Sequence, residues 1–287
     1  MLTKFLHSKH FKPGGKGALL LVVSLIIIGW LLNTPEGLLG KADAVGYAVC
    51  HRFDFRSFHL GERQMPLCAR CSGMYLASVL GIVYMGILSR RKAGFPGIKV
   101  GILFVLLFSG FAIDGANSLL NLVISDGLAK LNPGLYQLLS KFSLYQPNNL
   151  LRLLTGTGMG LVMAGVIFPA FNQSVWVDVD MSPALPGVKF FLPLVGLGLL
   201  VDLAVLSENL ILLYPLALIS SGGVLLLLTM IYTMLGLMIF KQENRFTDWK
   251  QLAFPTFMGF GFALLQIFLI DLLRYSFTQT WGGFPLL

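Results

Sequence analysis

The chain has 287 residues, of which 56% are hydrophobic and only 12% are charged. A soluble domain carries roughly 25% charged residues, so this composition excludes an ordinary water-soluble fold and indicates a lipid environment. The formal net charge is +8, but the basic residues gather in short segments between long apolar runs. This pattern is typical of positive-inside membrane topology and argues against nucleic acid as a partner.

Residues 1–16 form a basic tail with four lysines, and an apolar run follows it as far as Leu32. A secretory signal peptide starts in the same way. The residues that come next, Asn-Thr-Pro-Glu-Gly at 33–37, contain no small-residue cleavage site. We therefore expect the first apolar run to be an uncleaved transmembrane helix.

A bilayer core about 30 Å thick needs about 20 apolar residues per helix. Runs of suitable length lie at 17–33, 72–89, 99–124, 150–171, 189–206, 210–240 and 252–273. The sequence thus predicts an all-α fold, a polytopic transmembrane helical bundle of about seven helices. The fourth run contains Gly156 and Gly160, a small-xxx-small pair that favours close approach of another helix. The sixth is long enough to tilt or to break at residues 220–223, Ser-Ser-Gly-Gly.

The distribution of lysine and arginine predicts the orientation. The N-terminal tail and the segment 89–99 each contain four basic residues, and the segment 241–250 contains three. With alternating helices these segments share one side, which should be the cytoplasm. We expect a multi-pass protein of the plasma membrane, with the lipid bilayer as its surroundings and no protein partner indicated. Residues 34–71 and 125–149 then face outward.

All three cysteines, Cys50, Cys68 and Cys71, fall within the outward loop 34–71. A Cys-x-x-Cys turn can chelate one metal ion because it directs both sulfurs inward, as in zinc knuckles. Cys50 supplies a third sulfur, and His51 or His59 is the candidate fourth ligand. Steric reasons favour His59, because adjacent Cys50 and His51 reach one ion only with strain, whereas position favours His51. The loop therefore contains a complete Cys3His set for zinc or another soft-ligand metal.

Two other interpretations of these cysteines stay open. Cys68 and Cys71 can form a redox-active dithiol, with Cys50 as a third partner and Arg70 favouring thiolate. The cysteines can also be a structural clip that fastens the loop to the second helix. An odd number of cysteines cannot pair completely, which weighs against a purely structural disulfide.

Polar residues inside the third span form a stripe. Asp114 is followed by Asn117, Ser118 and Asn121 at i+3, i+4 and i+7, so all four share one helical face. A charged residue within a membrane helix costs roughly 2.5–3.5 kcal/mol on insertion scales and usually faces protein or a water-filled cavity. This stripe should therefore point toward the interior of the bundle.

Arg152 lies about one turn inside the fourth span, which begins after Pro147 with Asn148 or Asn149 as its N-cap. The helix dipole disfavours a cation there, so we expect an anionic partner, and Asp114 is the obvious one. The structural alternatives are snorkelling of Arg152 to the headgroups and an interhelical hydrogen bond from Asp114.

These residues predict a polar pocket between the third and fourth spans, beneath the cysteine loop. Asp114 and Arg152 are its candidate catalytic residues. Its candidate ligand-binding residues are Asn117, Asn149, Arg152 and Thr155. A lipid headgroup or another anionic ligand fits this set, since the guanidinium and the amides can donate hydrogen bonds to it.

Several motifs within residues 44–170 resemble one family of membrane proteins. They are Cys50-His51, Arg56-Ser57-Phe58, Gly61, Pro66-Leu67-Cys68-Ala69-Arg70-Cys71 with Gly73 and Tyr75, Asp114-Gly115, and Asn149-Leu150-Leu151-Arg152 with Thr155-Gly156. In this order they resemble DUF2085, a family of predicted membrane proteins of unknown function. The resemblance implies which residues belong together and names no reaction. It suggests a membrane core at 17–171, including the loop 34–71, followed by three further helices in 172–287.

Three classes of function are compatible with the sequence. The first is a metal-dependent membrane protein acting at the outer interface, where the metal stabilises the loop or activates water. The second is a thiol oxidoreductase coupled to a membrane quinone near Arg152. The third is a transporter or a non-enzymatic subunit with Asp114 as a proton or ion site. The sequence contains no Walker motif, dinucleotide fingerprint or serine elbow, so it leaves open whether the protein is an enzyme.

The predicted orientation can be tested by labelling cysteines introduced singly in intact cells with a membrane-impermeant maleimide. A cysteine at Glu62 should react and one at Arg91 should not, because short basic loops resist translocation. The parent protein, which retains Cys50, Cys68 and Cys71, provides the background signal. Labelling at Arg91 without labelling at Glu62 would mean that the orientation is inverted.

Overall fold

The structure, a computed structural model, describes residues 13–124 and 132–282. The elements along the chain are α1 (Pro13–Asn33), α2 (Gly37–Val49), a 3-10 turn (Asp54–Arg56), β1 (His59–Leu60), β2 (Arg63–Gln64), α3 (Ala69–Leu88), β3 (Lys92–Gly94), α4 (Ile98–Val123), α6 (Pro133–Ser140), α7 (Asn149–Val175), β4 (Asp180–Pro183), α8 (Val188–Leu206), α9 (Leu210–Ile239) and α10 (Trp249–Thr278). Helices dominate, and the predicted all-α bundle is confirmed.

Seven helices in the described part of the chain are long and apolar enough to cross a membrane. They are Gly15–Asn33, Ala69–Leu88, Ile98–Val123, Asn149–Val175, Val188–Leu206, Leu210–Ile239 and Trp249–Thr278. Each corresponds to one predicted run. The last helix begins three residues earlier than predicted, because the Asp248 side chain accepts a hydrogen bond from the backbone N–H of Lys250 and caps the helix there.

The sixth span, α9, is one continuous helix, so the break considered at residues 220–223 does not occur. Tertiary contacts support this polar segment. Ser221 donates a hydrogen bond to the carbonyl of Ala42 in α2 (3.1 Å), while Ser220 donates within α9 to the carbonyl of Ala217 (2.9 Å). Gly223 lies against the backbone of Tyr75 in α3, where a Cβ would meet the Tyr75 carbonyl at 2.9 Å. The small residues thus allow α9 to pack closely on α2 and α3.

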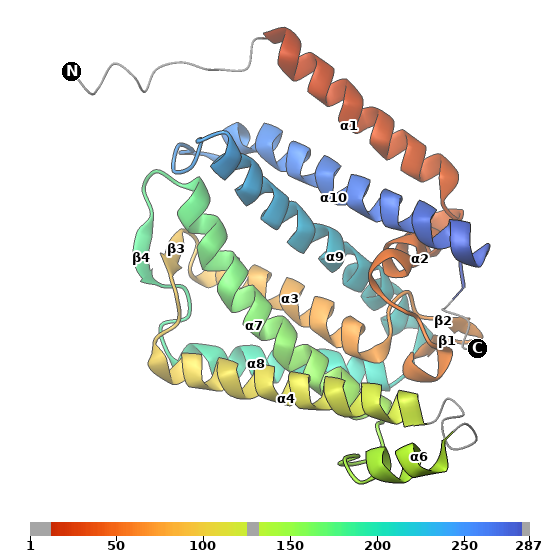
Figure 1. The fold of residues 1–287 in the computed structure, drawn as a ribbon. Helices are drawn as coiled ribbons and strands as arrows, with labels where there is room; N and C mark the ends of the chain where they lie inside the picture. Colours follow the sequence, from red (N-terminus) through yellow and green to blue (C-terminus); the bar gives the residue numbers. More distant parts are fainter. Residues whose placement is uncertain (1–12, 125–131, 283–287) are drawn as a thin grey trace.

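The centre of the bundle is the pair α3 and α7 (Figure 1). A Cβ added at Gly156 would collide with the carbonyl oxygen of Arg70, and one at Gly160 would collide with that of Met74. Gly73 of α3 approaches the carbonyl of Leu153 in the same way. Close packing through Gly156 and Gly160 is therefore confirmed, and α3 is the partner helix.

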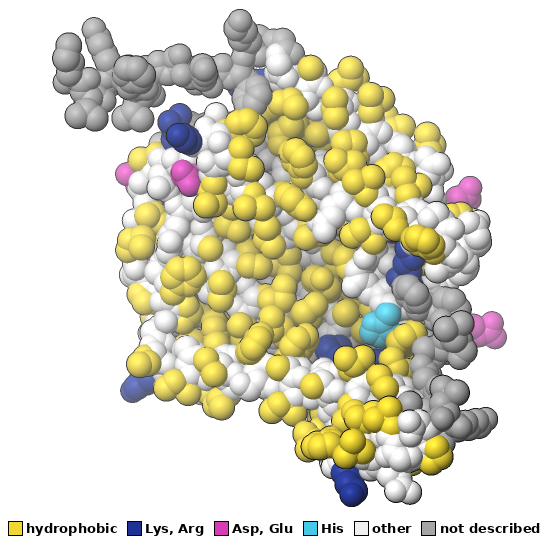
Figure 2. All heavy atoms as spheres, viewed as in Figure 1, with side chains coloured by type: hydrophobic (Ala, Val, Ile, Leu, Met, Phe, Trp, Pro, Cys, Tyr) yellow, Lys and Arg dark blue, Asp and Glu magenta, His cyan; other side chains and the backbone are white. Residues whose placement is uncertain are grey.

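The remaining helices surround this pair. Helix α9 contacts α3 and α10, while α4 packs on α7 and α8 packs on α3. Helix α1 contacts α10 and lies at the edge of the bundle, as Figure 1 shows. Hydrophobic side chains cover the middle of the face seen in Figure 2, while most charged side chains lie toward its margins. This distribution is the one expected of a surface that faces lipid.

Three loops meet at one end of the bundle: the α3–α4 loop, the α7–α8 loop and the α9–α10 loop. Strand β3 pairs with β4 in parallel, with Lys92 opposite Asp180, and Trp176 forms a bridge with Phe246. Helix α1 also begins at this end (Figure 1). The segments 89–99 and 241–250 therefore lie on the same side, as the alternation of spans predicted.

The cysteine loop, residues 34–71, lies at the opposite end of the bundle. It contains regular secondary structure, which the sequence did not predict. Helix α2 fills part of it, and a hairpin pairs His59 with Gln64 and Leu60 with Arg63. Gly61 turns this hairpin with φ +62°, a conformation that favours glycine. Helix α2 has only 13 residues, among them Gly40 and Gly46, so its sequence alone gives a weak helical signal.

Candidate metal centre and cationic pocket

The three cysteines converge at the start of α3. Their sulfur atoms lie within 4.8 Å of one another, and all three are free thiols. Cys50 follows the last residue of α2, Cys68 is the N-cap of α3, and Cys71 lies in the first turn of that helix. Helix α2 packs on α9 and α10, and its Gly46 lies against the backbone of Pro66, just before α3, so residues that are far apart in the loop come together.

Hydrogen bonds concentrate negative charge on Cys50. Its sulfur accepts from the backbone N–H groups of Arg52 (3.5 Å) and Cys68 (3.4 Å). Hydrogen bonds from the Cys68 and Cys71 side chains lower the pKa of Cys50 well below its usual value. The same bond to Cys50 raises the pKa of Cys68 to about 12. These hydrogen bonds therefore favour the thiolate form of Cys50 and the thiol form of Cys68.

The backbone around Cys50 is held by a residue from the last helix. Arg274 of α10 donates hydrogen bonds from Nη1 to the carbonyls of Tyr47 and Cys50, the latter at 2.7 Å, and from Nη2 to the carbonyl of His51 at 3.4 Å. Its guanidinium also lies over the Tyr47 ring, 3.9 Å from the centroid. The C-terminal helices therefore contribute directly to the geometry of the cysteine centre.

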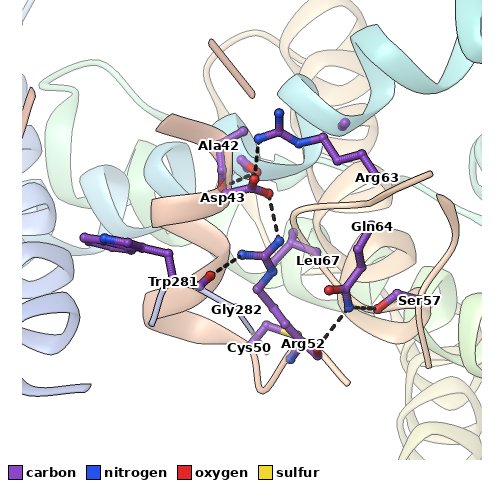
Figure 3. A network of polar contacts seen from close by, with 12 residues as sticks. Ala42, Asp43, Cys50, Arg52, Ser57, Arg63, Gln64, Leu67, Trp281 and Gly282 are labelled. Carbon is purple, nitrogen blue, oxygen red and sulfur yellow. Dashed lines mark hydrogen bonds and ion pairs between the residues drawn. The ribbon is translucent and has the colours of Figure 1, made fainter. Parts of the chain in front are cut away.

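A second network fastens the loop (Figure 3). The carboxylate of Asp43 in α2 accepts from Arg52 Nη2 at 2.9 Å and from Arg63 Nη2 at 2.5 Å. Gln64 donates to the carbonyl of Arg52 (2.9 Å) and to the hydroxyl of Ser57 (2.8 Å). These bonds tie the hairpin to the segment that follows Cys50.

Among the described residues, no ring nitrogen of His51 or His59 belongs to the group formed by the three sulfurs. His59 Nε2 is paired with Asp54 Oδ1 at 2.9 Å, and its side chain is 33% exposed. The ring of His51 is tilted by 56° against that of Phe53, with a centroid distance of 4.4 Å, and its buried Nε2 has no hydrogen-bond partner among the described residues. Burial lowers the pKa of His51, which keeps the imidazole neutral and able to act as a metal ligand.

Asp114 is a buried carboxylate with a complete set of partners. It forms an ion pair with Arg70 of α3, and Oδ1 accepts from the hydroxyl of Tyr145 at 2.7 Å. Thr155 of α7 donates to Oδ2 at 3.2 Å, and Arg70 also donates to Ser118 Oγ at 3.0 Å. The charge inside the bundle is thus compensated by groups from two neighbouring helices and the segment before α7.

The predicted ion pair between Asp114 and Arg152 is wrong. Asp114 is level with Thr155, which lies three residues, or about 4.5 Å, farther along α7 than Arg152. Arg70 projects from the first turn of α3 to the depth of Asp114 and takes the position expected for Arg152. The described residues place no carboxylate within ion-pair distance of Arg152.

Arg152 instead lines a pocket of about 580 Å³ at the start of α7. Its side chain is buried, Nη1 donates to Asn149 Oδ1 at 2.9 Å, and Nε has no hydrogen-bond partner among the described residues. Asn149 also contacts the carbonyls of Phe55 (3.4 Å) and Ser57 (3.5 Å) through Nδ2. Arg56 lines the pocket too, and its Nη2 donates to the carbonyl of Ser118 at 3.0 Å.

Two of the four predicted ligand-binding residues, Asn149 and Arg152, line this pocket, whereas Asn117 and Thr155 do not. Asn117 holds the segment before α7, because Nδ2 donates to the carbonyl of Tyr145 and Oδ1 accepts from the N–H of Leu144, both at 2.9 Å. Thr155 is engaged with Asp114 and with the carbonyl of Leu151 at 2.8 Å. Both residues therefore organise the walls around the pocket.

The contacts of Arg70, Tyr145, Arg274 and Arg56 were not predicted from the sequence. A signal for Arg70 did exist, because a basic residue between two clustered cysteines lies close to the depth of Asp114. Tyr145 and Arg274 carry no such signal, since their partners come from distant segments.

Comparison with known proteins identifies one family. Residues 50–166 match the family model described as Predicted membrane protein (DUF2085). The chain therefore carries a DUF2085 segment, as its motifs predicted. The DUF2085 segment contains the three cysteines, Asp114 and Arg152, which the fold gathers at one end of the bundle. No curated protein and no solved structure matches the chain.

The ion pair yields a prediction about stability. Asp114→Asn and Arg70→Gln should each lower the free energy of unfolding by about 3–5 kcal/mol, because each leaves one buried charge uncompensated. The double variant should lose less than the sum of the two losses. Reversible unfolding in mixed micelles measures these energies. Arg152→Gln combined with Asp114→Asn is the control and should be nearly additive. Coupling of Asp114 to Arg152 in place of Arg70 would contradict the structure.

Proposed function

We propose that this integral membrane protein binds zinc or another soft-ligand metal at Cys50, Cys68 and Cys71, and that the bound metal fixes a cationic pocket for an anionic headgroup or another anionic ligand. The observation that carries the proposal is the convergence of three free sulfurs within 4.8 Å of one another.

The cysteine arrangement suits a tetrahedral metal. Zinc–sulfur bonds of about 2.3 Å place tetrahedral thiolate sulfurs about 3.8 Å apart, which is within the observed 4.8 Å limit. The N–H groups of Arg52 and Cys68 that point at Cys50 Sγ stabilise thiolate charge. Three protein sulfurs leave a fourth position, for which the neutral imidazole of His51 or a water molecule is the candidate.

The surroundings of the sulfurs favour a structural role for the metal. Cys50 and Cys68 are buried among apolar side chains from three other helices, including Trp30, Val224 and Leu264. Such a dry shell restricts the access of substrate and water. When bound, the metal would crosslink the end of α2 to the start of α3.

The crosslink would act on the pocket through two arginines of the loop. Arg56 ends the 3-10 turn that follows Cys50, and it lines the pocket. Arg70 lies between Cys68 and Cys71 and forms the ion pair with Asp114. Asn149 connects the pocket to the same loop through the carbonyls of Phe55 and Ser57. Fixing the three cysteines therefore fixes the groups that surround Arg152.

Arg152 makes the pocket suitable for an anion. It is buried in the first turn of α7, where the helix dipole is positive, and its described hydrogen-bond partner is the neutral amide of Asn149. A cation in this position is costly unless an anion approaches it. The pocket is open to a ligand, and Asn148, Asn149 and Gln146 add polar groups to its lining. A phosphate or carboxylate headgroup matches this chemistry.

A thiol oxidoreductase coupled to a quinone is the second candidate. Cys68 and Cys71 are free cysteines three residues apart at the start of α3, and their sulfurs lie within 4.8 Å of each other. This arrangement also suits a dithiol that exchanges electrons with partner thiols. Metal analysis separates the two candidates, because a thiolate that holds a metal is not free to form a disulfide.

The metal proposal predicts about one zinc per chain in protein purified without chelators, measured by inductively coupled plasma mass spectrometry. Cys50→Ser, Cys68→Ser and Cys71→Ser should each lose most of this metal and lower the melting temperature by similar amounts, because each ligand contributes to one site. Metal-free protein with a reversible Cys68–Cys71 disulfide would instead support the redox candidate.

The variants His51→Ala and His59→Ala, compared for zinc affinity, test which group is the fourth ligand. Loss of affinity in His51→Ala alone identifies His51. Equal retention of zinc in both variants identifies a non-protein fourth ligand. Retention of full metal by Cys50→Ser together with its loss in Cys68→Ser would contradict the three-sulfur site.

The pocket proposal predicts that glycerol phosphate binds the purified protein and that glycerol does not. Arg152→Gln should weaken this binding about tenfold or more, because a hydrogen bond to a charged group is lost. Isothermal titration calorimetry provides the measurement. Lys141→Gln is the control, since Lys141 is an exposed basic residue at the end of α6 that does not line the pocket. Equal binding by the two variants would place the anion elsewhere.

A further inference from the structure

A second cavity lies at the opposite end of the bundle from the Arg152 pocket. It has a volume of about 1230 Å³ and is lined by residues of α3, α7, α9 and α10. Ligand pockets for drug-sized molecules are commonly about 300–1,000 Å³, so this cavity is large enough for a longer ligand. Its walls are mainly apolar, and Phe168, Met230 and Phe257 are representative of them.

The depth of the cavity matches one leaflet of a bilayer. Both Trp249, in the first turn of α10, and Phe260 line it. These residues are 11 positions apart, which corresponds to about 16 Å along a helix. Half of a hydrocarbon core about 30 Å thick is about 15 Å. The cavity thus runs from the membrane interface toward the middle of the bilayer.

The charge of the lining is confined to the interfacial end. Arg90 and Arg91 line the cavity just beyond the end of α3, and no aspartate or glutamate is among the described lining residues. Arg91 is held there by a hydrogen bond from Nη2 to the carbonyl of Thr247 (2.5 Å) and by the Trp176 ring, whose centroid is 4.5 Å from its guanidinium carbon. The exposed side chain of Arg90 is beside it. A basic mouth therefore leads into an apolar interior.

We propose that this cavity is a binding site for one phospholipid with an anionic headgroup, drawn from the leaflet on the side of the segments 89–99 and 241–250. The acyl chain lies between α3, α7, α9 and α10, and the phosphate contacts Arg90 and Arg91. The hydrocarbon part of such a lipid matches the apolar walls and the depth of one leaflet, and its phosphate matches the basic mouth. The inference does not depend on the metal centre or on the Arg152 pocket, which lie at the other end of the helices.

Gly86 offers a way to block the cavity with little strain. It lines the cavity in α3, and a Cβ built there has no heavy atom within 4 Å. A leucine side chain at this position would extend into the cavity. Gly236 in α9 is the matched control, because it also has no neighbour within 4 Å of a built Cβ and does not line the cavity. Both substitutions replace a helical glycine, so their effects on helix propensity are comparable.

The test is native mass spectrometry of the detergent-purified protein mixed with equal amounts of dioleoyl phosphatidylglycerol and dioleoyl phosphatidylcholine. One phosphatidylglycerol should be retained per chain. Each basic side chain near a surface contributes roughly fivefold, so two predict a preference of about 25-fold over phosphatidylcholine. Arg90→Gln with Arg91→Gln should remove this preference. Gly86→Leu should reduce retention by about tenfold or more, because the chain and the leucine compete for space.

Four outcomes would overturn the proposal. They are equal retention of both lipids, no retained lipid, equal retention by Gly86→Leu and Gly236→Leu, and loss of retention in Arg152→Gln, which would assign the lipid to the other pocket. If Gly86→Leu does not fold, Ala253→Phe is the second blocking variant, since Ala253 lines the cavity from α10. Failure of glycerol phosphate binding at Arg152 would leave the lipid result unaffected.

Discussion

The buried ion pair between Asp114 and Arg70 is the interaction on which the rest of this end of the molecule depends. In lipid, a lone carboxylate at the depth of Asp114 is costly, so the fold must bring a cation and hydrogen-bond donors to it. Arg70 can reach Asp114 because Gly156 allows the backbone of α7 to touch α3 beside that arginine. Close packing of the central helices and compensation of the buried charge are therefore one requirement, met by the same few residues.

The same constraint links the cysteine centre to the pocket. Arg70 lies between Cys68 and Cys71, so its position depends on the conformation of the first turn of α3. The hydroxyl of Tyr145 donates a hydrogen bond to Asp114. The carbonyl of Tyr145 accepts the hydrogen bond from Asn117 that holds the segment before α7. A change at the cysteines would thus be transmitted to the start of α7, where Arg152 lines the pocket.

The two ends of the bundle differ in chemistry. At the cysteine end, arginines are buried with amides and carbonyl groups in a small polar pocket. At the other end, Arg90 and Arg91 form the edge of a large apolar cavity, beside loops that are joined through β3, β4 and the bridge between Trp176 and Phe246. Arginine close to apolar walls suits ligands that combine a charged group with a hydrocarbon chain. Helix α10 takes part in both ends, because its Arg274 holds Cys50 and its Trp249 borders the cavity.

The sequence by itself determined the membrane class, the seven spans and the shared side of two basic loops, because hydropathy and loop charge are local properties that lipid acts on directly. It also identified the cysteines, since their types and spacing were sufficient to expect a cluster. Only the tertiary structure decided that Arg70 and not Arg152 pairs with Asp114, that Asn117 supports a wall, and that neither His51 nor His59 lies within the sulfur group. Those outcomes depend on the relative depth and rotation of packed helices. Composition and periodicity constrain these quantities too weakly, because a difference of one helical turn changes the partner of a buried charge.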